Sequence, residues 1–180
     1  GFSGADLRNL VNEAALLATH LCLIQRGRIV QHGATGDVLT RPATVAAARL
    51  LDLPNLFTGT LERDGTARTL RWGPHALALP AAADAEPAAG TAWTILPTKV
   101  LLHRVDRPSR GERENPVRAT VADLVTLGDD VIARLVPEGL PDARLHLKLS
   151  LHVAQRNSLA PGREVTVSLL ADAIVPLAGE

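Results

Sequence analysis

The part of the chain that follows Asn55 constrains the fold most, because it consists of short apolar or alternating segments separated by turn residues. The segments are 56–63, 68–72, 76–79, 92–96, 117–125, 131–136, 144–151, 164–169 and 173–177. A period of two sends successive side chains to opposite faces of a strand. Many such strands, spaced about ten residues apart, are typical of a β sandwich or a small barrel. We therefore predict a mainly antiparallel β domain over residues 55–177.

Two polar stretches interrupt this β region. Residues 80–90 are mostly Ala, Pro, Asp and Glu, and residues 106–115 are rich in charge and contain proline and glycine. Such composition is typical of surface segments rather than core elements. We predict a surface loop over Pro80 to Gly90 and a solvated linker over Asp106 to Asn115, which separates a lobe at 55–105 from a lobe at 115–177.

The N-terminal portion has helical and hairpin signals. Residues 3–18 predict a helix that begins after Ser3, because apolar residues there recur at helical spacing and Asp6 stands in the first turn. The apolar runs 21–24 and 28–30 flank a turn that contains Gly27, which predicts a small hairpin. The fold class is therefore α+β, with a short helical and hairpin portion before an OB-like barrel or sandwich.

A second helical stretch is expected between the hairpin and the β domain. Residues 37–40 predict a helical turn, and Pro42 suits the first turn of a helix that runs through Val45 and Leu50 and stops near Pro54.

Composition argues against several classes of partner. The chain has 180 residues, 46% of them apolar, with 19 basic and 19 acidic residues. A net charge of zero gives no field that would attract nucleic acid or an anionic membrane, and no stretch approaches the ~20 apolar residues of a membrane-spanning helix. We expect neither nucleic acid binding nor direct membrane insertion. Cys22 has no partner cysteine, and we interpret it as a small buried hydrophobe.

Aromatic residues bear on the same question, because OB folds that bind oligonucleotides stack bases on exposed aromatic rings. This chain has Trp72, Trp93 and no tyrosine. The two tryptophans are either core residues or stacking residues, and the sequence alone leaves both possibilities open.

Several landmarks in residues 21–59 agree in order and spacing with one known family. The segment reads "LCLIQRGRIVQHGATGDVLTRPATVAAARLLDLPNLFTG". It resembles the end of the nucleotide-binding domain of importer-type ABC ATPases, in which "G-R-I-V-Q-x-G", "P-x-x-x-x-A-R-x-L" and "N-L-F-x-G" follow one another. The resemblance implies that residues 21–54 are the hairpin and helix that end this domain.

The region after residue 59 resembles the transport-associated OB-type β domain, or TOBE domain, that follows in that family. Leu96-Pro97 with Val100 is similar to its "I-R-P-x-x-V-x-L" strand, and the segment from Leu159 to Val165 is similar to its "L-x-P-G-x-x-V" turn. Proline followed by a glycine with positive φ would reverse the chain sharply at this turn.

Residues 1–18 point elsewhere. The segment "GFSGADLRNLVNEAALLA" resembles the lid-domain helix of membrane-bound AAA metalloproteases, in which the "G-F-S-G-A-D-L" segment lies beside the bound nucleotide. The resemblance makes residues 1–20 a lid-like helix and Gly4, Ala5 and Asp6 candidate nucleotide contacts. The alternative is a capped amphipathic helix of no such ancestry. A truncated, chimeric or engineered chain would explain the junction with the ABC-like part.

ATP chemistry is not expected of this chain alone. The sequence has no G-x-x-x-x-G-K-[ST] loop, no ABC signature and no H-E-x-x-H helix. The resemblance implies ATP and Mg for the full-length parent and no cofactor for this chain. Thr19-His20 is similar to a Thr-His pair whose histidine contacts the γ-phosphate in ABC ATPases. About a dozen residues separate that histidine from the following strand in the family, and here they are adjacent, so His20 is only a candidate remnant.

One branch of the family's β domains binds molybdate or tungstate through a "T-x-x-S" turn and an "I-K-A-S" strand. Alignment on Leu159 and Gly162 places Ser150 at the threonine position. The other three ligand positions carry Val153, Leu170 and Asp172. Ser150 is therefore the one candidate anion ligand that is retained.

The six histidines form no spacing typical of a zinc site, and we predict no metal. His146 and His152 lie in the apparent strand "LHLKLSLH", which would place both on one solvated face.

The function that the resemblance implies is that of a regulatory, subunit-contacting C-terminal portion of an ABC importer ATP-binding subunit. Expected partners are a second copy, contacted through the β domain, and permease subunits at the cytoplasmic face of the inner membrane. Alternatives are a small-oxyanion sensor and a fragment of an AAA ATPase or protease.

Overall fold

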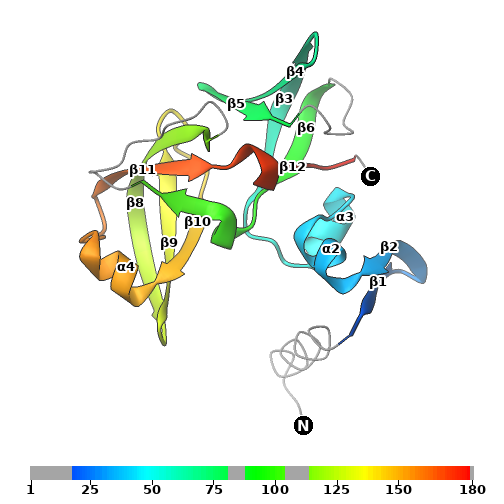
Figure 1. The fold of residues 1–180 in the computed structure, drawn as a ribbon, viewed down its shortest axis with the longest axis horizontal. Coiled ribbons are helices and arrows are strands. Elements are labelled where there is room, and N and C mark those ends of the chain that lie inside the picture. Colours follow the sequence, from blue (N-terminus) through cyan, green and yellow to red (C-terminus); the bar gives the residue numbers. More distant parts are fainter. Residues whose placement is uncertain (1–17, 81–87, 104–113, 179–180) are drawn as a thin grey trace. The chain divides into compact units, whose positions relative to one another are not determined.

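The structure, a computed structural model, describes residues 18–80, 88–103 and 114–178 (Figure 1). It divides between Asp52 and Leu53 into an N-terminal unit and a C-terminal unit. The predicted helix over residues 3–18 lies outside the described residues, except for its last position. His20, which the predicted helical segment 1–20 included, is the first residue of a strand.

The N-terminal unit begins with the predicted hairpin. Strands β1 (His20–Gln25) and β2 (Arg28–Ala34) pair antiparallel. Arg26 and Gly27 connect them with φ values of 51° and 76°. Two positive φ values in a two-residue connection are the geometry that follows the right-handed twist of paired strands. The hairpin prediction is therefore confirmed.

Two short helices complete this unit: α2 (Thr35–Thr40) and α3 (Val45–Leu50). Thr44 caps α3, because its side chain accepts a hydrogen bond from the amide of Ala47 at 3.1 Å. The prediction that Pro42 lies in the first turn was wrong, because the helix begins only after this threonine cap.

Cys22 is exposed, so its interpretation as a buried residue was wrong. Strand alternation places it on the opposite face of β1 from its half-buried neighbours Leu21 and Leu23.

The C-terminal unit contains two five-stranded antiparallel sheets (Figure 1). The first sheet has the order β12-β6-β3-β4-β5, and the second has the order β7-β11-β8-β9-β10. The strands are β3 (Leu56–Asp64), β4 (Ala67–Trp72), β5 (His75–Leu79), β6 (Ala88–Thr94), β7 (Val100–Leu102), β8 (Pro116–Leu127), β9 (Asp130–Pro137), β10 (Leu145–Ser150), β11 (Glu164–Leu169) and β12 (Val175–Pro176). The predicted α+β class with an antiparallel OB-like β domain is confirmed.

The two sheets are copies of one arrangement. In each, a 3-10 turn follows the fourth strand: η1 (Pro97–Lys99) after β6, and η3 (Ala171–Ala173) after β11. The register also repeats, because Leu56 pairs with Thr94 in the first sheet just as Pro116 pairs with Ser168 in the second. The chain is therefore internally duplicated over the β region.

The last strand of each copy crosses to the other sheet. β7 follows β6 along the chain and pairs with β11, whereas β12 follows β11 and pairs with β6. The predicted division into lobes at 55–105 and 115–177 therefore does not separate the two sheets. The last strand of each lobe pairs with a strand of the other lobe. Sequence spacing alone carries no signal for this exchange.

One apolar core runs through both sheets. Its aromatic part lies in the first sheet, where Phe57 contacts Trp72 and Trp93 at ring-centroid distances of 4.7 and 5.0 Å. Both tryptophans are buried, at 4% and 0% exposure. They are core residues and offer no surface on which a base could stack.

Two buried asparagines join the sheets at equivalent places. The Asn55 side chain donates to the carbonyl of His146 at 2.8 Å and accepts from its amide at 2.7 Å. The Asn115 side chain does the same with Ala78, at 2.9 and 2.7 Å, and also donates to the carbonyl of Leu169. Asn115 is thus a structural link, and the prediction that it belongs to a solvated linker was wrong.

The predicted loop over residues 80–90 is also corrected at its end, because residues 88–90 already belong to β6. The rest of that loop and most of the predicted linker, residues 81–87 and 104–113, lie outside the described residues.

Two local features follow β10. The strand ends at Ser150, whose side chain caps the helix α4 (Leu151–Arg156). His152 therefore stands on a helix, and the prediction that it shares a strand face with His146 was wrong. The reversal at Pro161 and Gly162 is confirmed: Gly162 has φ of 82°, and the amide of Arg163 donates to the carbonyl of Ala160 at 3.1 Å.

Candidate functional site

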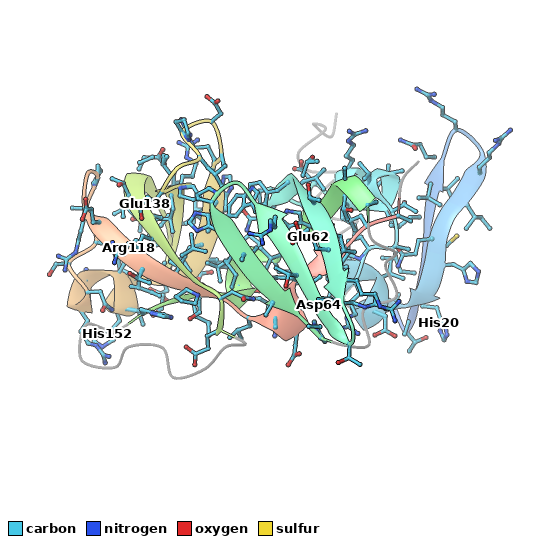
Figure 2. All side chains as sticks on the ribbon, turned by 90° about the horizontal axis from the view of Figure 1, so that it is seen from above. His20, Glu62, Asp64, Arg118, Glu138 and His152 are labelled. Carbon is cyan, nitrogen blue, oxygen red and sulfur yellow. The ribbon has the colours of Figure 1, made fainter. Side chains whose placement is uncertain are left out.

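The candidate nucleotide contacts receive no support from the described residues. His20 is exposed on β1, and its Nδ1 lies 3.3 Å from the hydroxyl of the preceding residue, Thr19 (Figure 2). Gly4, Ala5 and Asp6 lie outside the described residues. The role of His20 as a remnant stays a prediction.

The side chain of the candidate anion ligand Ser150 caps a helix. Its hydroxyl accepts a hydrogen bond from the amide of Val153 at 3.4 Å, which caps α4. Asp172 is exposed on η3, and Leu170 directly precedes that turn. A carboxylate and two aliphatic side chains cannot donate hydrogen bonds to an oxyanion, so Ser150 stands without the donors that the resemblance would require.

The described histidines do not gather into a metal site. Among the residues that the structure describes, no three His, Cys, Asp or Glu side chains come together in a way that could hold an ion. His103 Nε2 contacts the hydroxyl of the buried Ser168, and it lies 3.8 Å from a carboxylate oxygen of Glu114. Both contacts use the same ring nitrogen. The arrangement therefore differs from a nucleophile triad, in which the acid orients the base through its other nitrogen.

The second sheet carries a groove of about 750 Å³. It is lined by Leu102, His103, Arg118, Ala119, Thr120, Val136, Pro137, Glu138, Gly139, Pro141, Asn157, Leu159, Arg163, Glu164, Val165 and Thr166. Its floor is the outer face of the strands, and its sides are the β9–β10 turn and the connection from α4 to β11. A groove of this volume is within the range of small-molecule sites.

Strand register explains the polar floor of this groove. Arg118 on β8 pairs with Thr166 on β11, and the amide of His103 donates to the carbonyl of Thr166 at 2.9 Å. On the other side, the amide of Glu138 donates to the carbonyl of Arg118 at 2.9 Å. Directly paired residues face the same side of a sheet. Glu138, Arg118, Thr166 and His103 therefore form one row across the sheet, which we call the polar row; Figure 2 labels its members Glu138 and Arg118.

The sequence alone does not reveal the groove. The alternation in "VRATV" and "EVTVS" does place Arg118, Thr120, Glu164 and Thr166 on solvent-facing positions. The alternation does not show that these two segments pair with each other, because they are more than forty residues apart in the sequence.

The curled antiparallel sheets, with few helices and a barrel-like arrangement, define an OB-type β domain. No protein-family model matches the chain. A solved structure of the cytoplasmic molybdate-binding protein ModG, with molybdate bound, matches 69% of this chain and 95% of its own, with a TM-score of 0.56 at 16% identity. That likeness shows the fold.

Curated relatives match over more of the sequence. The molybdenum import ATP-binding protein ModC of Mycobacterium tuberculosis is 31% identical over 161 residues, which cover 88% of this chain and 42% of the relative. The molybdate/tungstate import ATP-binding protein WtpC of Thermococcus kodakarensis is 29% identical over 130 residues, 72% of this chain and 36% of the relative. The predicted resemblance to ATP-binding proteins of ABC importers is therefore confirmed.

The chain spans less than half of the length of these curated relatives. Among the residues that the structure describes, no helix has both the length and the apolar character needed to cross a bilayer.

Proposed function

We propose that this chain is the C-terminal part of the ATP-binding subunit of an importer for an oxyanion such as molybdate or tungstate, and that its β domain tunes the contact between subunits. The observation that carries the proposal is the match to ModC over 88% of this chain. The fold adds support, because the β domain has the OB-type architecture expected after the nucleotide-binding part.

The proposal assigns the work of this chain to its surface. ATP and Mg would be bound by the part of the parent protein that carries the phosphate-binding loop, which this sequence does not contain. The parent would lie at the cytoplasmic face of the inner membrane, bound to permease subunits. Its β domain would contact the β domain of a second copy.

A graft tests the proposal. Residues 55–178 would replace the corresponding C-terminal part of the ModC relative, and molybdate uptake would be measured in cells that lack their own ATP-binding subunit. We expect the graft to support ATP-dependent uptake, and we expect a version without these residues to take up molybdate with altered rate or control. Uptake that is identical with and without the β domain would contradict the regulatory role.

The oxyanion sensor is the second candidate, and the described ligand positions argue against it. Val153, Leu170 and Asp172 offer neither a hydroxyl nor an ammonium group at the positions that the resemblance assigns to ligands. An exposed carboxylate at Asp172 would repel an oxyanion by about 1 kcal/mol at short range. Calorimetric titration of the chain with molybdate, tungstate and sulfate tests this, and heat at micromolar ligand would favour the sensor over a purely contact-mediated role.

The AAA alternative depends on residues 1–18. If these residues held a nucleotide near Gly4, Ala5 and Asp6, ATP would raise the melting temperature of the chain. We expect no ATP-dependent shift.

A further inference from the structure

The groove on the second sheet has the features of a ligand site, and the proposed contact between subunits assigns no task to it. We propose that it binds a small zwitterion, an amino acid with an apolar side chain, with the carboxylate at Arg118 and the ammonium group at Glu138 and Glu164. The proposal goes beyond the importer assignment, since it concerns a site on the β domain itself.

The duplicated fold supplies an internal comparison. The pairing of Arg118 with Thr166 is repeated in the first sheet by the pairing of Thr58 with Ala92. The hydrogen bond from the His103 amide to the carbonyl of Thr166 is repeated there from Leu177 to Ala92, at 2.8 Å. Three members of the polar row thus have Thr, Ala and Leu as their structural equivalents. The backbone arrangement does not require ionisable side chains at these places, because one copy forms it with threonine, alanine and leucine.

Most charged side chains of the groove have no side-chain partner among the residues that the structure describes. The Arg118 guanidinium and the Glu138 and Glu164 carboxylates form no ion pair or side-chain hydrogen bond with any described residue. Arg163 uses one nitrogen to bind the carbonyl of Ser158 at 3.0 Å, which leaves its other donors open. Arginine binds carboxylates through paired hydrogen bonds.

Charge and wall composition narrow the ligand class. The charges of two arginines and two glutamates in the groove sum to zero, and the polar row places Glu138 beside Arg118. A floor that offers both signs of charge suits a zwitterion better than a simple anion or cation. Seven lining residues have apolar side chains: Leu102, Ala119, Val136, Pro137, Pro141, Leu159 and Val165. They offer contact to an aliphatic side chain, and Thr120 and Thr166 add hydroxyls that donate or accept.

The test is a titration of the full 180-residue chain with L-leucine, in which NMR measures the backbone amide chemical shifts at each ligand concentration. We expect saturable shifts at Arg118, Thr166 and Glu138, with a dissociation constant on the order of 0.1–1 mM. N-acetyl-L-leucine lacks the ammonium group and L-leucinamide lacks the carboxylate, and each should bind at least about tenfold more weakly. Equal binding of all three would overturn the zwitterion assignment.

Matched variants locate the site. Arg118→Thr gives the second sheet the residue that the first sheet carries, and it should weaken L-leucine binding at least about tenfold. Thr58→Ala, at the equivalent position, should bind as the unmodified chain does. Glu138→Gln, which keeps the shape of the side chain, should weaken L-leucine but not N-acetyl-L-leucine. Unchanged binding in Arg118→Thr, shifts that cluster outside the groove, or no shifts at about 10 mM ligand would each contradict the proposal.

Discussion

Single residues hold the two sheets of the β domain together, and Asn115 illustrates this best. Its side chain makes three hydrogen bonds to the main chain of two strands, one in each sheet, and it is 4% exposed. Its φ of 44° is in the left-handed region, which asparagine tolerates better than most residues. Composition alone suggested a linker there, because a charged neighbourhood does not reveal which polar residue turns inward.

Replacement of Asn115 should therefore destabilise the whole β domain. Asn115→Ala leaves buried main-chain groups without partners and puts at φ of 44° a residue that tolerates the left-handed region less well than asparagine. We therefore expect a loss of about 2–4 kcal/mol in the free energy of unfolding. Asn115→Gly removes the same hydrogen bonds without the backbone strain, and it should lose less. Urea denaturation checks both, and a loss below about 0.5 kcal/mol in each would contradict the linking role.

His146 should make stability depend on pH. Burial lowers the pKa of the His146 imidazole below its ordinary value of 6.5, and the charge of Arg134 lowers it further. Well above pH 6.5 the ring is neutral in the folded and the unfolded chain. As the pH falls below that value, the unfolded chain takes up the proton first, so the free energy of unfolding should fall until the folded pKa is reached.

Denaturant unfolding of the unmodified chain and of His146→Gln at several pH values measures this contribution. The variant should show a smaller decline in stability below pH 6.5 than the unmodified chain does. Equal declines in the two proteins would show that the histidine contributes nothing.

At the scale of elements, the strands were largely predictable and their partners were not. Alternation located β8, β9 and β11 closely, since an apolar core on one side imposes the period of two. The helix α4 was missed because Leu151 and Val153 continue the alternation of β10. Only the cap made by the Ser150 hydroxyl ends the strand. The groove was missed for a related reason, since its floor exists only once β8 and β11 pair.

The exchanged strands give an element-scale prediction. A chain truncated after Leu170 loses β12 and the buried residues Ile174 and Leu177, which exposes the edge of β6 in the first sheet. Tryptophan fluorescence should shift to the red and its cooperative unfolding transition should weaken, because Trp93 pairs with Pro176. A chain ending at Ala178 is the control and should behave normally. A normal transition in the shorter chain would show that the exchange is dispensable.

At the scale of the molecule, the shared core and the exchanged strands should make the β domain unfold as one unit. Both tryptophans lie in the first sheet, so their fluorescence reports that sheet. Leu135→Ala opens a cavity in the second sheet at a fully buried position and should cost about 2–5 kcal/mol. We expect the fluorescence midpoint to fall with it, together with the circular dichroism midpoint.

Leu127→Ala is the matched control, because Leu127 is 59% exposed on the same sheet. It should leave both midpoints nearly unchanged. If Leu135→Ala left the unfolding midpoint measured by fluorescence unchanged, the two sheets would unfold independently.

The most direct test of action by contact is the solution mass of the chain. Light scattering across a range of concentrations should show a rise from the 19.0 kDa of one chain toward twice that mass. The dimer should persist when Arg118 is changed to Thr, because the groove is assigned to a ligand and not to the second copy. A single monomeric mass at every concentration up to about 100 μM would contradict the account.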